Sequence, residues 1–142
     1  GSLDTVLLLD VLEHMYNPWA ELEFLAQNLP ADAQVIVSLP NIGHIAVLGA
    51  LARGAFHYEP TGILDVTHIR FFTLAEMHSM FDETGFQIDG TWILSSSPNV
   101  AIDSFPAQVE AGKLTITVDS AEEWQRVNTL QFGFRLRRKP RC

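Results

Sequence analysis

Strand-like and helix-like segments alternate along the chain, and this alternation limits the fold more than any other feature of the sequence. The aliphatic residues 5–9 (TVLLL) predict a buried strand. Asn17 followed by Pro18 predicts a helix over residues 17–29, because asparagine caps helices and proline suits their first position. Residues 34–39 (QVIVSL) predict a second strand. Strands separated by helices form sheets with helices packed on their faces, so we expect an α/β fold.

Three further helices are predicted from their capping residues. Residues 45–53 are mostly apolar, and Gly54 can close a helix there. The segment TLAE, which begins at Thr73, has the spacing of a capping box and predicts a helix that ends at Gly85. The segment SAEE, which begins at Ser120, has the same spacing and predicts a short helix.

Two more strands complete the predicted sheet, at residues 86–95 and 130–138. In the last strand, bulky apolar residues alternate with glycine and arginine, which indicates one buried and one solvated face. The stretch 96–112 gives no definite prediction. The apolar members of the last strand are Phe132, Phe134 and Leu136.

Composition limits the class of protein. The 142 residues suit one domain, with 47% hydrophobic and 18% charged residues. The net charge of −8 argues against nucleic-acid binding, because a phosphate backbone would be repelled. No apolar run reaches the roughly 18 residues of a membrane span. Cys142 is the single cysteine, which excludes an internal disulfide and leads us to expect a cytoplasmic protein.

Polar residues follow directly after the first two predicted strands. Asp10, Glu13 and His14 follow the first, and Asn41 follows the second. Ligands of open α/β sheets bind beyond the carboxyl ends of the strands, so these residues are candidates for a site. An imidazole titrates near neutrality and can remove a proton, which makes His14, backed by Glu13, a candidate general base. The alternative is that the Glu-His pair only braces the following helix.

A second candidate region is the polar stretch HYEPTGILDVTHIRFFT, residues 57–73. A long polar connection between packed elements is often functional. Here His68 and Arg70 alternate with apolar residues, so one side can meet a polar substrate. The alternative is an internal hydrogen-bond network, in which Asp65 pairs with Arg70.

Other chemistries have less support. The sequence contains no H-E-x-x-H motif, no cysteine cluster and no G-x-S-x-G elbow. A metal site built on Glu13 and His14 would need further ligands that the sequence does not show, so we predict no metal site. We assign His44 and His78, both on predicted helices, to structural roles.

The segments LLLDVLEHMYNPW, VIVSLPN and FFTLAEMHSMFDETGF together resemble class I S-adenosylmethionine (SAM)-dependent methyltransferases, in particular small bacterial members. The resemblance runs from about Leu3 to Pro140. It implies a Rossmann-like, three-layer sheet that is mostly parallel, with an antiparallel last strand. It also implies methyl transfer from SAM to a small polar acceptor, such as a sugar-like molecule.

The resemblance also implies roles for individual residues. His14, Glu13 and His68 would be catalytic. Asp10 and Val11 would lie beside the methionine end of SAM. A further set would line the substrate pocket, namely Asn41, Tyr58 and Arg70.

One part of the family pattern is missing. None of the nine glycines forms a G-x-G turn, and the acidic residue that would bind the ribose is absent. We therefore expect residues 1–142 to be a partial domain that lacks the N-terminal cofactor-binding half. On that basis this chain alone would bind SAM weakly or not at all.

Two expectations follow from a half-domain. The first concerns function: the alternative to an enzyme is that the chain is a non-catalytic interaction or scaffold module derived from a methyltransferase. The strand at residues 5–9 would also lack its inner neighbour, which leaves unpaired backbone groups on an apolar edge. We therefore expect a homodimer joined through that strand.

Overall fold

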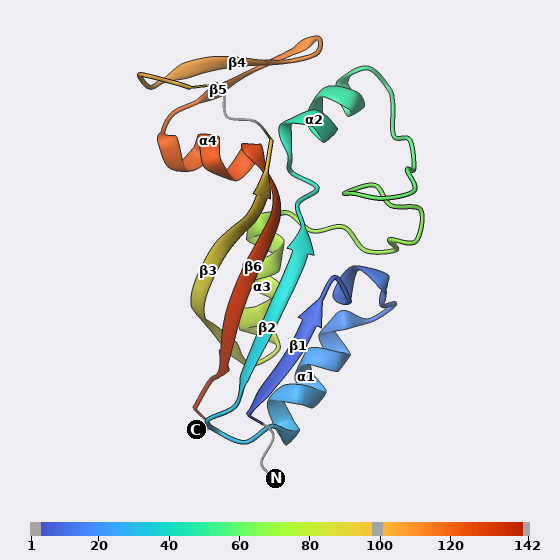
Figure 1. Ribbon diagram of the computed structural model, residues 1–142, viewed down its shortest axis with the longest axis vertical. Coiled ribbons are helices and arrows are strands. Elements are labelled where there is room, and N and C mark those ends of the chain that lie inside the picture. The colour runs from blue at the N-terminus through green and yellow to red at the C-terminus, as the bar shows by residue number, and fades with distance from the viewer. Residues whose placement is uncertain (1–3, 98–100, 141–142) are drawn as a thin grey trace.

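The computed structural model describes residues 4–97 and 101–140 and has a four-stranded mixed sheet at its centre (Figure 1). The strands are β1 (Thr5–Leu9), β2 (Gln34–Pro40), β3 (Phe86–Ser96) and β6 (Thr129–Arg138), in the order β1-β2-β6-β3. β1 and β2 are parallel, whereas β6 runs antiparallel to both β2 and β3. The α/β class and the antiparallel last strand are therefore confirmed.

Helices connect the strands at the places that the capping residues predict. They are α1 (Pro18–Asn28), α2 (Ile45–Ala52), α3 (Leu74–Glu83) and α4 (Ala121–Asn128), and the short 3-10 helix η1 (Leu12–His14) follows β1. The side chains of Asn17, Thr73 and Ser120 each accept a hydrogen bond from a backbone N–H of the helix that follows. Across the described ranges, none of the helices combines the length and the apolar character that crossing a membrane would need.

A β-hairpin begins inside the stretch 96–112, which had no definite prediction, and extends beyond it. It consists of β4 (Ala107–Ala111) and β5 (Leu114–Val118), joined by Gly112 and Lys113. Gly112 has a φ of +64°, a conformation that glycine adopts without strain. The hairpin lies against α2, where a Cβ on Gly49 would come within 2.8 Å of the Ala111 carbonyl oxygen.

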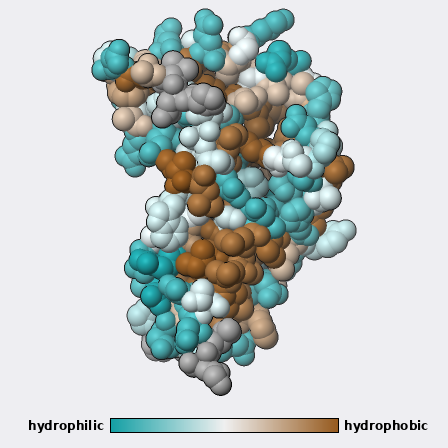
Figure 2. Space-filling view, in the orientation of Figure 1, coloured by the Kyte–Doolittle hydropathy of each residue, from teal (hydrophilic) through white to brown (hydrophobic). Residues whose placement is uncertain are grey.

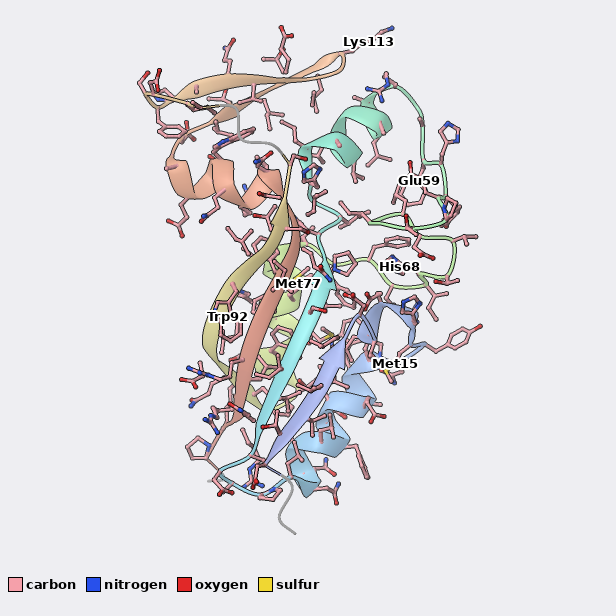
Figure 3. The ribbon with its side chains drawn as sticks, viewed as in Figure 1. Met15, Glu59, His68, Met77, Trp92 and Lys113 are labelled. Atoms are coloured by element: carbon pink, nitrogen blue, oxygen red, sulfur yellow. The ribbon has the colours of Figure 1, made fainter. Side chains whose placement is uncertain are left out.

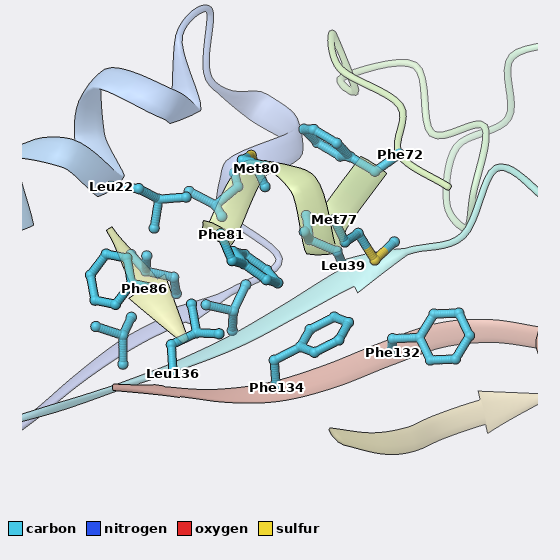
Figure 4. Close-up of a cluster of buried hydrophobic side chains, with 14 of the residues drawn as sticks. Leu22, Leu39, Phe72, Met77, Met80, Phe81, Phe86, Phe132, Phe134 and Leu136 are labelled. Carbon is cyan, nitrogen blue, oxygen red and sulfur yellow. The ribbon is translucent and has the colours of Figure 1, made fainter. Parts of the chain in front are cut away.

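The hydrophobic core lies between one face of the sheet and helices α1 and α3 (Figure 4). The predicted alternation in β6 is confirmed, because its apolar side chains are buried while its arginines are only half-buried. Phe134 lies near the centre, with its ring 5.1 Å from that of Phe81. The helices contribute further buried side chains, namely Leu22, Met77, Met80 and Phe81.

Two predictions about the opposite face of the sheet are wrong. The three-layer arrangement is not found, because in the described ranges α1 and α3 lie on the same face. Both crossovers, from β1 to β2 and from β2 to β3, move in one direction along the sheet, and right-handed crossovers then place both helices on one side. Strand β1 is also not fully buried: Leu8 is, but Leu7 is 61% and Leu9 51% exposed. Figure 2 shows apolar side chains gathered over the sheet on this open face.

His44 caps α2 and joins it to the end of β3. Its Nδ1 accepts a hydrogen bond from the Ala46 N–H (3.1 Å), and its Nε2 lies 3.0 Å from Ser97 Oγ. Burial lowers the pKa of His44, because the charged ring would lose its hydration. The structure thus agrees with the structural role predicted for this histidine.

This arrangement makes stability depend on pH. The unfolded chain takes up a proton on His44 near the usual value of about 6.5, but the folded chain does so only at lower pH. The contribution of His44 should therefore be complete above that value and should be lost as the pH falls toward the folded-state pKa. Urea unfolding at several pH values measures this loss.

The variant His44→Asn tests the cause, because asparagine also caps helices but does not titrate. We expect it to lose less stability than the wild type over the same pH range. His57→Asn, which removes an exposed imidazole, is the matched control. Equal losses in the His44 variant and the wild type would contradict the assignment.

Candidate functional site

A pocket lies at the carboxyl ends of β1 and β2, where the sheet topology places ligands. Its volume is about 340 Å³. η1 and the segment between α2 and α3 form its polar wall, and Figure 3 shows His68 on that segment above the end of β1. The polar residues that line the pocket include Asp10, Glu13, His14, Asp65, His68 and Gln131.

Asp10 is held at the end of β1 in an uncommon conformation. Its φ is +53°, in the left-handed region that aspartate and asparagine tolerate better than most residues. Its backbone N–H donates to Ser38 Oγ (2.9 Å), and Ser38 Oγ donates to Asp10 Oδ1 (2.8 Å). Gln131 Nε2 donates to the same carboxylate oxygen. The carboxylate is thus fixed at the pocket wall by β2 and β6.

Backbone hydrogen bonds attach the α2–α3 segment to η1. The Glu13 carbonyl oxygen accepts from the N–H groups of Ile69 (2.9 Å) and Arg70 (3.1 Å). His14 Nδ1 lies 3.2 Å from the Thr67 carbonyl oxygen. These bonds bring two regions of the sequence together that both carry candidate residues.

The result is an acid–imidazole cluster of Glu13, His14 and His68. Glu13 Oε1 lies 3.9 Å from His68 Nε2, and the two imidazole rings meet edge to face at 4.8 Å. Glu13 is only 1% exposed, and its Oε2 has no hydrogen-bond partner. Burial raises the pKa of the Glu13 carboxyl, and the nearby Asp10 charge raises it further. The structure therefore brings the three residues predicted as catalytic into one site, while their catalytic roles stay predictions.

Asn41, predicted to contact the substrate, is buried and connects parts of the fold. Its Nδ2 donates to the carbonyl oxygens of Arg126 (3.0 Å) and Thr129 (2.9 Å), and its Oδ1 accepts from the Gly43 N–H (3.0 Å). The two Nδ2 bonds join the end of β2 to α4 and to the start of β6, and the Oδ1 bond closes a local turn. Its predicted contact with a substrate stays untested.

The other predicted residues lie around the pocket without lining it. Val11 packs partly buried against the core. Tyr58 is exposed, with its ring against Phe56. Arg70 donates to the carbonyl oxygens of Tyr16 and Ile69.

The suggested pairing of Asp65 with Arg70 is replaced by a local turn. Asp65 Oδ1 accepts from the Thr67 N–H (2.8 Å) and hydroxyl (2.6 Å). These two bonds lower the pKa of the Asp65 carboxyl. Because Thr67 donates both hydrogen bonds to the Asp65 carboxylate, the Arg70 guanidinium donates to backbone oxygens instead.

Sequence reasoning missed two residues of the site, Ser38 and Gln131. Both hold the Asp10 carboxylate from neighbouring strands. Ser38 could have been found, because it is a polar residue near the carboxyl end of a mostly apolar strand. Gln131 carries no comparable signal, since its contact with Asp10 spans 121 positions of the sequence.

Comparison with known families and solved structures identifies the family of the chain. The profile of the family described as "Methyltransferase domain" matches residues 1–91. The chain belongs to this methyltransferase family. The predicted resemblance is therefore confirmed at the level of the family, whose members use SAM. A search of the curated proteins finds no match.

Solved structures with the same fold include SAM-dependent methyltransferases. A protein from Archaeoglobus fulgidus aligns with 96% of this chain and 60% of its own, at 13% identity and a TM-score of 0.59. A protein from Thermotoga maritima aligns with 96% of this chain and 56% of its own, at 13% identity and a TM-score of 0.52. At this identity the likeness shows the fold alone. The methyltransferase chain spans little more than half the length of these structures.

Proposed function

We propose that this methyltransferase chain provides the acceptor-binding side of a site that transfers the SAM methyl group to a small polar, sugar-like molecule. The observation that supports the proposal most is the acid–imidazole cluster in a pocket at the carboxyl ends of β1 and β2. Methyl transfer requires the acceptor atom to be aligned with the sulfonium methyl group, so much of the catalysis is positioning. A rigid polar wall beside the cofactor serves that purpose.

The charge of the pocket suits the methionine end of SAM. That end carries a sulfonium, an ammonium and a carboxylate group and so has a net positive charge, and Asp10 presents a fixed carboxylate at the wall of the pocket. The left-handed conformation at Asp10 turns the chain at the end of β1, where the cofactor of this family would pass. This geometry supports the cofactor-binding role predicted for Asp10.

The size and lining of the pocket suit a small polar acceptor. A volume of about 340 Å³ falls at the lower end of small-molecule sites. Carboxylates and imidazoles can accept hydrogen bonds from hydroxyl groups, which a sugar supplies in numbers. A large apolar acceptor would leave these groups without partners.

We expect this chain alone to bind SAM with a Kd in the millimolar range or weaker. A millimolar Kd corresponds to a binding free energy of about −4 kcal/mol, and weaker binding to a smaller magnitude. The reason is that the 142 residues contain no G-x-G turn to hold the cofactor. Titration of the ¹⁵N-labelled chain with SAM should shift the amide resonances of Asp10 and Val11. Asp10→Asn, which keeps the shape but removes the charge, should reduce these shifts.

The matched control is Asp103→Asn, at an exposed position before β4. It should leave the titration unchanged. Micromolar binding would contradict the expectation of a weak site, and shifts confined to residues outside the pocket would contradict the proposed cofactor position.

In an active methyltransferase that contains this chain, His14→Ala should lower kcat more than it weakens SAM binding. The proposal places His14 beside the acceptor, where its interactions contribute chiefly in the transition state. Radiolabelled methyl transfer and SAM calorimetry measure the two effects separately. Unchanged turnover together with lowered stability would assign His14 the bracing role instead.

A second candidate function is an interaction module, and the open face of the sheet favours it. β1 has one strand neighbour in the described sheet, and Leu7 and Leu9 are exposed beside it. We propose that a second copy of the chain pairs with this edge. The two functions are compatible, because the pocket lies at the carboxyl ends of the strands rather than along the β1 edge.

A further inference from the structure

The acid–imidazole cluster has the composition and spacing of a metal site. Its three ligand atoms, one from each side chain, lie within 4.8 Å of one another. Around a shared ion with bonds of about 2.1 Å, tetrahedral ligand atoms lie roughly 3.4 Å apart, so the cluster would need to contract by at most about 1.4 Å. His14 is exposed, so its side chain has room to make most of that movement. The sequence showed two of these ligands, and the fold adds His68 as the third.

Both histidines are oriented as metal ligands usually are. His14 Nδ1 lies 3.2 Å from the Thr67 carbonyl oxygen, and His68 Nδ1 lies 3.0 Å from the Ile63 carbonyl oxygen. A carbonyl oxygen only accepts, so each Nδ1 carries the proton and donates it. In the neutral ring, Nε2 then has a free lone pair. A backbone carbonyl that fixes the Nδ1–H tautomer is the common outer-shell partner of a metal-bound histidine.

Glu13 presents a buried carboxyl group with one oxygen that has no hydrogen-bond partner. Its Oε2 is buried without a hydrogen-bond partner, and Oε1 is 3.9 Å from His68 Nε2, which is beyond a hydrogen bond. Within residues 4–97 and 101–140, no lysine or arginine forms an ion pair with it. A buried carboxylate is costly unless it is paired or coordinates a cation.

We infer that Glu13, His14 and His68 bind a divalent transition-metal ion. Two imidazole nitrogens and one carboxylate oxygen suit Zn²⁺, Mn²⁺, Fe²⁺ or Co²⁺ better than Mg²⁺ or Ca²⁺, which prefer oxygen ligands alone. Three protein ligands leave coordination positions open toward the pocket, where an acceptor hydroxyl could bind. With the ion bound, His14 Nε2 would be a ligand and not a free base. The inference does not rest on methyl transfer, because ion binding is measured without SAM or acceptor.

Titration of the apo chain with Co²⁺ tests the inference, since bound Co²⁺ reports its ligands in the visible absorption spectrum. The experiment uses Cys142→Ser throughout, so that the single thiol cannot contribute. We expect one Co²⁺ per chain, displaced by Zn²⁺. Glu13→Gln, which keeps the side-chain volume, and His14→Ala, at an exposed position, should each weaken binding by at least about tenfold.

His57→Ala is the matched control, because it removes an exposed histidine outside the cluster, and it should leave the affinity unchanged. A second readout is thermal unfolding, which Co²⁺ should shift upward in the control and much less in Glu13→Gln. Absence of a saturable Co²⁺ spectrum at millimolar ion would overturn the inference. So would equal affinity in the control and in a folded His14→Ala variant.

Discussion

Replacing Phe134 with alanine is expected to lower the free energy of unfolding by about 3–5 kcal/mol. Phe134 is 0% exposed and lies on β6, between β2 and β3, so the cavity cannot be filled by a surface rearrangement. Its ring meets those of Phe81, Phe132 and His78 at centroid distances of 5.1, 6.3 and 5.9 Å. The loss would be a large part of the total stability of a domain of this size, which is typically about 5–15 kcal/mol.

Phe24→Ala provides the matched control, because it deletes the same ring from a helix position that is 59% exposed. We expect it to change the free energy of unfolding by less than about 0.5 kcal/mol. Denaturant titrations of both variants give the two values. Equal effects would mean that the core does not lie between this face of the sheet and α3.

Local signals in the sequence were enough to place the main helices and the four strands of the sheet. Asn17, Thr73 and Ser120 cap helices where predicted, because a short polar side chain before an apolar turn satisfies backbone donors within a few residues. The hairpin of β4 and β5 was missed. Its two strands alternate apolar and polar residues on either side of Gly112, and this pattern could have predicted it.

Long-range features could not be predicted in the same way. The exposure of Leu7 and Leu9 depends on which face the helices cover, and a short aliphatic run looks the same in either case. The site also contains residues that local signals predicted and a contact that they could not predict. Glu13 and His14 were found from their position after a strand, but the approach of His68 depends on hydrogen bonds between η1 and residues more than fifty positions later.

That division also explains why the metal site was not predicted. From the sequence, Glu13 and His14 are two neighbouring ligands without a third, and the five histidines follow no ligand spacing. The third ligand comes from a segment whose own conformation is set by the Asp65–Thr67 turn and by the His68–Ile63 contact. A site assembled by a long loop is therefore visible only once the loop is placed.

The second large effect concerns the open edge of β1. We expect the wild-type chain to form a homodimer at micromolar concentrations and Leu7→Lys to weaken dimerisation by at least about 100-fold. An antiparallel pair of β1 strands about a two-fold axis near Leu7 would place the two Leu7 side chains opposite each other, since a two-fold interface brings identical residues together. It would also join the open apolar faces of the two sheets. In the variant, two ammonium groups would meet at the axis, and like charges directly opposite destabilise a strand pair.

Light scattering across a dilution series measures the change in mass. Leu51→Lys is the matched control, because it adds the same charge at an exposed leucine of α2, away from the sheet edge. It should dimerise like the wild type, because its charge lies outside the paired strands. A wild-type chain that stays monomeric at high concentration would refute the pairing, and dissociation of both variants to the same extent would assign the effect to net charge rather than to the β1 edge.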